Sequence, residues 1–174
     1  MYIKKGTKRI VLVFDNFDFV VKVAKIRLLE AIRCAIDLSS CGLFWRSAFS
    51  CTVENYGIAQ FLFAGIVENW NERKFCKETR LKCLVPTYLS IFGLVNIQKK
   101  GDVLCDISDK SLWSKMCEIM SEKIWEYPHL FNNPSNFCKT QEGHIQIVDY
   151  GSARCHGVIR KYCDEIYNLN LEDE

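Results

Sequence analysis

The sequence lacks the features that mark several common protein classes. No apolar run reaches the ~18 residues that a membrane-spanning helix needs, and the first nine residues lack the apolar segment of a secretory signal. No His-Glu-x-x-His, P-loop or Gly-x-Ser-x-Gly motif occurs. Basic residues do not alternate with aromatic ones as they do on RNA-binding surfaces. We therefore expect a cytoplasmic protein with neither a membrane nor a nucleic-acid partner.

Cysteine is abundant, but no Cys-x-x-Cys pair occurs. Ten cysteines accompany only three histidines in 174 residues, whereas zinc ribbons and thioredoxin-type sites normally contain that pair. Without an export signal, a disulfide framework is not expected. We predict free thiols, mostly buried as small hydrophobic side chains, with a non-sequential metal site as the alternative.

The composition indicates a folded chain whose charge is unevenly distributed. Apolar residues make up 49% and charged residues 25%, and eleven Phe, four Trp and seven Tyr can fill a sizeable core. The net charge is +2, yet residues 1–30 alone carry seven basic residues against three acidic ones. A basic N-terminal part favours an anionic ligand, and a solvated surface is the alternative.

Hydrophobic periodicity divides the chain into two parts. Residues 1–100 contain a predicted hairpin at 9–24, a helical insert at 25–65, a helix at 57–80 and two short strands at 87–98. We expect the insert to pack beside the strand at 19–24. Residues 101–174 contain a predicted helix at 108–125, a loop and hairpin at 127–151, and a short tail. The sequence therefore predicts an α+β fold with two small sheets.

The second predicted hairpin is the most informative segment. Asn136 stands at its start and Asp149 at its end, so folding returns an amide and a carboxylate to the same point. Such oxygen ligands suit a hard cation such as Mg²⁺, which takes further oxygens from phosphate.

This segment, NFCKTQEGHIQIVDYG at 136–151, resembles the protein-kinase family from the catalytic-loop asparagine through the Asp-Phe-Gly motif. A second stretch, Phe19-Val20-Val21-Lys22, resembles the family's Val-Ala-Ile-Lys strand. The resemblance covers roughly residues 9–24 and 66–152. It implies a minimal kinase-like fold with a small N-terminal antiparallel sheet plus helices, and a truncated C-terminal lobe.

The resemblance also implies roles for single residues in binding ATP and Mg²⁺. Asp149 and Asn136 would hold the metal, and Lys22 would reach the nucleotide phosphates. Val20 would contact the adenine ring.

Two further parts of such a site have candidates. The backbone groups of Gln98 and Lys99 would lie near the adenine. A helix glutamate would hold Lys22, and Glu68 and Glu72 are both candidates because they lie one turn apart on the same helix face. Of the two, Glu72 is preferred.

The chain also departs from the family in ways that bear on activity. Phe131 stands where the family has its catalytic aspartate, no glycine-rich loop precedes the first strand, and only 23 residues follow Gly151. The first hypothesis is therefore a pseudokinase that acts by binding a protein partner. Truncated kinase-like proteins are encoded by phages and other viruses, so a host protein in the host cytoplasm is one candidate partner. A minimal active phosphotransferase that modifies a protein is the second hypothesis, and an interaction protein without nucleotide is the third.

Overall fold

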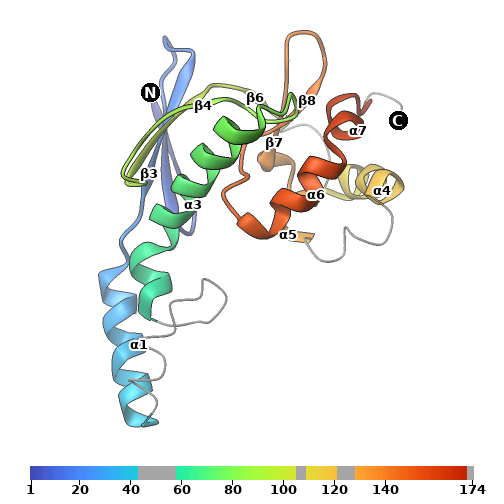
Figure 1. The fold of residues 1–174 in the computed structure, drawn as a ribbon. Helices are drawn as coiled ribbons and strands as arrows, with labels where there is room; N and C mark the ends of the chain where they lie inside the picture. Colours follow the sequence, from blue (N-terminus) through green and yellow to red (C-terminus); the bar gives the residue numbers. More distant parts are fainter. Residues whose placement is uncertain (43–57, 105–108, 121–127, 172–174) are drawn as a thin grey trace.

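The computed structural model describes residues 1–42, 58–104, 109–120 and 128–171. A five-stranded sheet with a long helix across it forms one part, and a three-stranded sheet with several short helices forms the other (Figure 1). The predicted α+β class with two small sheets is confirmed. None of the described helices is both long and apolar enough to cross a membrane.

The larger sheet is antiparallel throughout and contains the predicted first hairpin. Its strands are β1 (Tyr2–Lys5), β2 (Arg9–Val13), β3 (Phe19–Ala24), β5 (Val95–Lys99) and β4 (Thr87–Ile91), in that spatial order. Strands β2 and β3 form the hairpin, with Val11 opposite Lys22 and Val13 opposite Val20. The sequence did not predict β1, which is exposed along its whole length. Its two lysines are typical of an edge strand.

Strands β4 and β5 form the second pair of predicted strands. The expected break between them is confirmed at Phe92 and Gly93, which both have positive φ angles, of 50° and 71°. A two-residue pattern of this kind reverses the chain with the twist that antiparallel strands require. A Cβ atom at Gly93 would lie 2.5 Å from the Ile66 carbonyl oxygen, so glycine lets this turn approach the long helix closely.

The helical region begins with α1 (Leu28–Ser40) and continues with α3 (Ile58–Thr79). Helix α3 contacts strands β3, β4 and β5, whereas α1 packs against the start of α3 and extends away from the sheet (Figure 1). The α1 part of the insert therefore does not pack beside the lysine strand as expected, whereas Gly65, at the end of the insert, lies against Ala24 of that strand. Leu29 and Ile36, part of the apolar stripe of α1, are 70% and 62% exposed. The rest of the insert, at 43–57, lies outside the described residues.

The second part is built around strands β6 (Asp102–Val103), β7 (Phe137–Lys139) and β8 (Ile145–Ile147). The predicted second hairpin is confirmed as β7 and β8, which pair with Phe137 opposite Ile147. The surrounding helices are α4 (Asp109–Met120), α5 (Pro128–Phe131), η2 (Pro134–Asn136), η3 (Ala153–Cys155), α6 (His156–Lys161) and α7 (Cys163–Tyr167). Helix α4 matches the predicted helix at 108–125 as far as the described residues allow.

The main hydrophobic core lies in this second part. Leu112, Met116 and Met120, which the periodicity of α4 placed on one face, are fully buried in it. The segment between α3 and β4 is bonded to β8. The Val85 N–H donates to the Ile147 carbonyl at 3.0 Å, and the Ile147 N–H donates to the Cys83 carbonyl at 2.8 Å. The core therefore fixes β8, and the residues that follow it, relative to α3.

The eight described cysteines are free thiols, and Cys83, Cys138, Cys155 and Cys163 are buried. Burial raises the pKa of the Cys138 and Cys155 thiols to about 12. Within the described ranges, no group of three His, Cys, Asp or Glu side chains could hold a metal ion. The four buried thiols therefore serve as core side chains.

Candidate functional site

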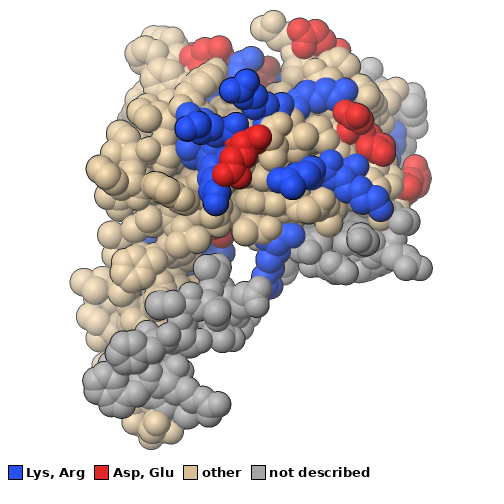
Figure 2. Space-filling view, in the orientation of Figure 1, with Lys and Arg blue, Asp and Glu red and all other residues tan. Residues whose placement is uncertain are grey.

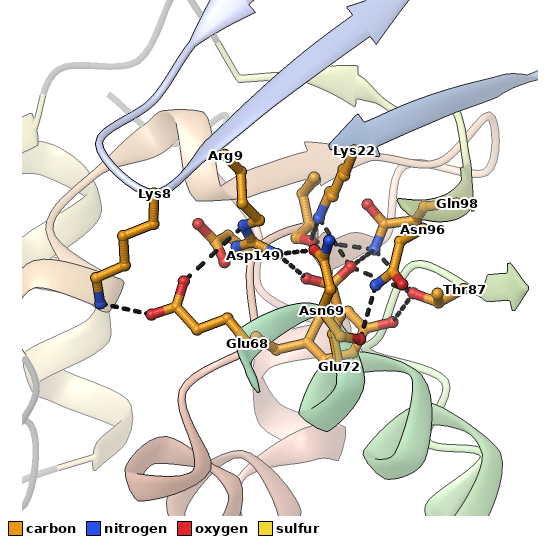
Figure 3. Close-up of polar contacts among 12 residues, drawn as sticks. Lys8, Arg9, Lys22, Glu68, Asn69, Glu72, Thr87, Asn96, Gln98 and Asp149 are labelled. Carbon is orange, nitrogen blue, oxygen red and sulfur yellow. Dashed lines mark hydrogen bonds and ion pairs between the residues drawn. The ribbon is translucent and has the colours of Figure 1, made fainter. Parts of the chain in front are cut away.

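Lys22 reaches the space between the larger sheet and α3 from the middle of β3. Strand alternation places Lys22 and Val20 on the face that looks toward α3. The lysine is only 3% exposed, and its Nζ donates to Glu72 Oε1 at 2.9 Å and to the Val148 carbonyl at 2.8 Å (Figure 3). Burial lowers the pKa of Lys22, although Glu72 opposes this effect.

Glu72 is the centre of the polar cluster and is fully buried on α3. Its carboxylate accepts hydrogen bonds from Lys22, from Arg9 Nη1 at 2.6 Å, from Thr87 Oγ1 at 3.3 Å and from Gln98 Nε2 at 3.1 Å (Figure 3). Four donors therefore compensate for the removal of this charge from water.

Of the two glutamates that the sequence left as candidates, Glu72 is the one that holds the lysine. Glu68, one turn earlier on α3, instead accepts a hydrogen bond from Lys8 Nζ at 2.6 Å. The structure therefore brings Lys22 together with Glu72 and leaves Glu68 at the edge of the cluster.

Arg9, at the start of β2, is the site residue that sequence reasoning missed. Its Nη1 donates to Glu72 and to Asn69 Oδ1, and its Nη2 donates to Asp149 (Figure 3). Burial works against the charge of the guanidinium, but the carboxylates of Asp149, Glu72 and Glu68 outweigh it and raise the pKa of Arg9. Because the residues of β2 after Arg9 are all apolar, the sequence did not show which face of this strand is turned inward.

Asp149 follows β8 and lies beside Arg9, with its side chain 48% exposed. Partial burial opposes its ionisation, but Arg9, and next Lys22, lower the pKa of Asp149 to about 2. Asp149 is therefore a carboxylate at neutral pH and is already paired with a cation.

Asn136 directly precedes β7 and lies at the same end of the hairpin as Asp149, as the sequence predicted. Its backbone carbonyl accepts a hydrogen bond of 2.7 Å from the Val148 N–H, which ties the start of β7 to the segment after β8. Its side-chain Nδ2 donates to the Leu130 carbonyl at 3.0 Å. Asn136 and Asp149 line the same cleft.

Gln98 does not occupy the position expected for it. Strand β5 lies between β3 and β4, so its backbone belongs to the sheet. The fully buried Gln98 side chain donates to Glu72 and, at 3.1 Å, to the Val148 carbonyl. The Gln98 side chain therefore stabilises the polar cluster, and Gln98 is not among the residues that line the cleft. Lys99 does line it, but its N–H donates to the Pro86 carbonyl at 2.8 Å.

Further polar side chains form hydrogen bonds next to the cluster. Asn69 Nδ2 donates to the Gly93 carbonyl at 2.9 Å, and Asn96 Nδ2 donates to the Asn69 carbonyl at 2.8 Å. The Tyr150 hydroxyl lies 2.8 Å from Thr87 Oγ1 and donates to the Val85 carbonyl at 2.6 Å. These bonds fix α3 and the segment after β8 to the larger sheet.

The cleft above the cluster is strongly basic. It has a volume of about 740 Å³, and its described lining contains seven basic side chains against two acidic ones. The basic residues are Lys4, Lys5, Lys8, Arg9, Lys22, Lys99 and Lys100. Val13, Val20, Val148 and Leu130 add apolar surface to the wall. A cavity with this lining suits an anionic ligand that also has an apolar part.

Positive charge also gathers outside the cleft. On the side of the molecule drawn in Figure 1, lysine and arginine side chains form groups that surround smaller acidic ones (Figure 2). Lys74, Lys77 and Arg80 at the end of α3, and Arg160 and Lys161 of α6, are exposed. The net charge of +2 therefore conceals regions with a clear excess of positive charge.

Phe131, which the sequence resemblance aligns with a catalytic aspartate, lies in the hydrophobic core. It is fully buried, and its ring centroid lies 6.4 Å from that of Phe137. Its side chain therefore belongs to the packing of the second part and does not line the cleft.

Comparison with known proteins adds no assignment to these observations. No protein-family model matches the sequence, and no curated protein matches it significantly.

Proposed function

We propose that this chain is a kinase-like, nucleotide-binding protein whose phosphoryl transfer is impaired, that is, a pseudokinase. The observation that carries the proposal is the buried ion pair between Lys22 and Glu72 at the base of a basic cleft. A lysine that is only 3% exposed is rare unless it is paired, and Lys22 is among the residues that line the cleft. Together with the motif residues Asn136 and Asp149, the pair reproduces the arrangement expected of a kinase-like phosphate site.

The lining of the cleft supports ATP as the ligand class. An excess of five positive charges among the lining side chains complements a triphosphate, since seven basic residues face two acidic ones. Val13 and Val20, which lie opposite each other on β2 and β3, offer an apolar surface for the base. Together these features fit a nucleotide better than a small inorganic anion.

Impaired phosphoryl transfer is supported by the groups near the phosphate site. Phe131 has no proton-accepting group, and its ring is packed in the core. The two acidic side chains of the described lining, Glu68 and Asp149, are each paired with a cation. In kinases the catalytic-loop aspartate accepts the proton of the substrate hydroxyl. We therefore propose that the protein acts by binding a protein partner, with a host protein as the candidate class.

A thermal-shift titration of the full chain with ATP tests the nucleotide site. A ligand at 100 times its Kd should stabilise the fold by about 2.7 kcal/mol. Lys22→Met should abolish the shift because it removes the ammonium group that faces the phosphates, whereas Lys77→Met, an exposed lysine of the same helix as Glu72, should retain it. No shift of the wild type at millimolar ATP contradicts the proposal and supports an interaction protein without nucleotide.

The same proteins distinguish the pseudokinase from a minimal phosphotransferase. The pseudokinase proposal expects no labelled product when the chain is incubated with γ-phosphate-labelled ATP and a mixture of cell proteins. Label that appears with the wild type and disappears with Lys22→Met would instead establish phosphoryl transfer.

A further inference from the structure

The charge balance at the base of the cleft is completed by Arg9. Lys22, Glu72 and Asp149 alone would carry one net negative charge, which a bound cation would have to balance. Arg9 supplies that positive charge from within the chain, because its guanidinium bridges Glu72 on α3 and Asp149 after β8 (Figure 3). The cluster of these four side chains is therefore neutral without any added ion.

Burial and hydrogen bonds hold the Arg9 side chain in one position. The residue is only 7% exposed, and its place in the register of β2, opposite Ala24, directs it to the inner face of the sheet. Nη1 is engaged by Glu72 and Asn69, and Nη2 by Asp149. The planar fork of arginine suits a bridge between two carboxylates, which a lysine cannot form as a single point charge.

A divalent metal fits poorly at Asp149 while Arg9 is bound there. Mg²⁺ requires near-octahedral oxygen ligands at short distance. Among the described residues that line the cleft, the only carboxylates are those of Glu68 and Asp149, and both already accept from cations. A metal on Asp149 would also lie next to the guanidinium, where like charges repel.

We infer that Arg9 takes the place of the metal, so that this site binds a nucleoside polyphosphate without a divalent cation. This inference rests on the proposed function, since it names how the same site binds its ligand. The cluster at the base of the cleft is neutral without a metal, and the lining adds four further positive charges, those of Lys4, Lys5, Lys99 and Lys100. Phosphate oxygens would thus meet positive charge that belongs to the protein.

Calorimetric titration of the wild-type chain with ATP, once in EDTA and once in excess MgCl₂, tests the inference. We expect the two Kd values to agree within about threefold, less than 1 kcal/mol apart. In Arg9→Gln, binding in EDTA should weaken by about tenfold or more, and Mg²⁺ should restore part of it because Asp149 is then open to a metal. Arg33→Gln, which removes an exposed arginine of α1, should behave as the wild type.

The outcomes separate the failure of this inference from the failure of the proposed function. Wild-type binding that requires Mg²⁺ overturns the role of Arg9 and leaves the nucleotide site intact. The absence of ATP binding under both conditions overturns both. If Arg9→Gln does not fold, the paramagnetic signal of Mn²⁺ added to the wild type without ATP decides the question. Mn²⁺ that is immobilised on the protein contradicts the inference, and Mn²⁺ that remains as in buffer alone supports it.

Discussion

At the scale of single residues, Glu72 joins four elements through one carboxylate. It accepts from Arg9 of β2, Lys22 of β3, Thr87 of β4 and Gln98 of β5. We predict that Glu72→Gln destabilises the fold by about 3–5 kcal/mol, because it leaves two buried cations with one anion fewer. Urea unfolding followed by circular dichroism measures the change.

Glu78→Gln is the matched control on the same helix. Glu78 is 58% exposed and lies 4.0 Å from Lys74, a spacing of four residues. Such exposed pairs contribute about 0.5 kcal/mol or less. Equal losses in the two variants would contradict the central position given to Glu72.

The site residues differ in how far the sequence could predict them. Sequence reasoning singled out Lys22, Asn136 and Asp149 from the pattern of their segments, and the structure places all three at the cleft. The glutamate partner of Lys22 could be narrowed only to Glu68 or Glu72, since residues one turn apart share a helix face. Arg9 was missed because a basic residue at the start of a strand has the same local pattern whether it faces water or a buried carboxylate. Only the tertiary structure decides between these environments.

At the scale of elements, Gly151 sets how closely the segment after β8 approaches α3. A Cβ atom there would lie 2.7 Å from the Glu68 carbonyl oxygen and 2.9 Å from its Cβ. We predict that Gly151→Ala lowers the free energy of unfolding by about 1–3 kcal/mol, because the backbone of α3 or of this segment must move. Thermal unfolding provides the measurement.

Gly157, in helix α6, is the comparison for this substitution. Nothing lies within 4 Å of a Cβ atom built at that position. Gly157→Ala should therefore stabilise the protein by roughly 0.5–1 kcal/mol through helix propensity. A loss at Gly157 as large as at Gly151 would show that the close approach to Glu68 is not the cause.

Elements with strong periodicity were predicted well, and those defined by tertiary contact were not. The β2–β3 and β7–β8 hairpins followed from alternation, and the β4–β5 pair followed from the break at Phe92-Gly93. The edge strand β1 was missed because four exposed residues produce no hydrophobic alternation. Gln98 was expected to offer its backbone to a ligand, whereas the structure shows its buried side chain bonded to Glu72 and to the Val148 carbonyl. The role of a buried amide inside a strand becomes clear only when its partners are known.

At the scale of the whole molecule, the described cysteines differ in how far their thiols are exposed to solvent. Cys138 and Cys155 are buried with pKa values of about 12, whereas Cys41 is exposed. At pH 8 only about one in ten thousand of the buried thiols is ionised, and the thiolate is the reactive form. We predict that iodoacetamide modifies Cys41 in the folded protein long before Cys138 or Cys155, as peptide mass spectrometry can measure.

Unfolding provides the control for this order of reaction. In urea, all ten cysteines of the sequence should react at similar rates. Rapid modification of Cys138 or Cys155 in the native protein would mean that the second part opens on the time scale of the reaction.

The contacts at the base of the cleft also determine when the cleft can form during synthesis. Lys22 and the Val148 carbonyl that accepts its hydrogen bond are separated by 126 residues. At a translation rate of ~5–20 residues per second, roughly 6 to 25 seconds pass between the synthesis of the two. A ribosome-bound chain thus contains its lysine strand well before β8 exists. The base of the cleft can therefore be completed only after the segment that follows β8 has been made.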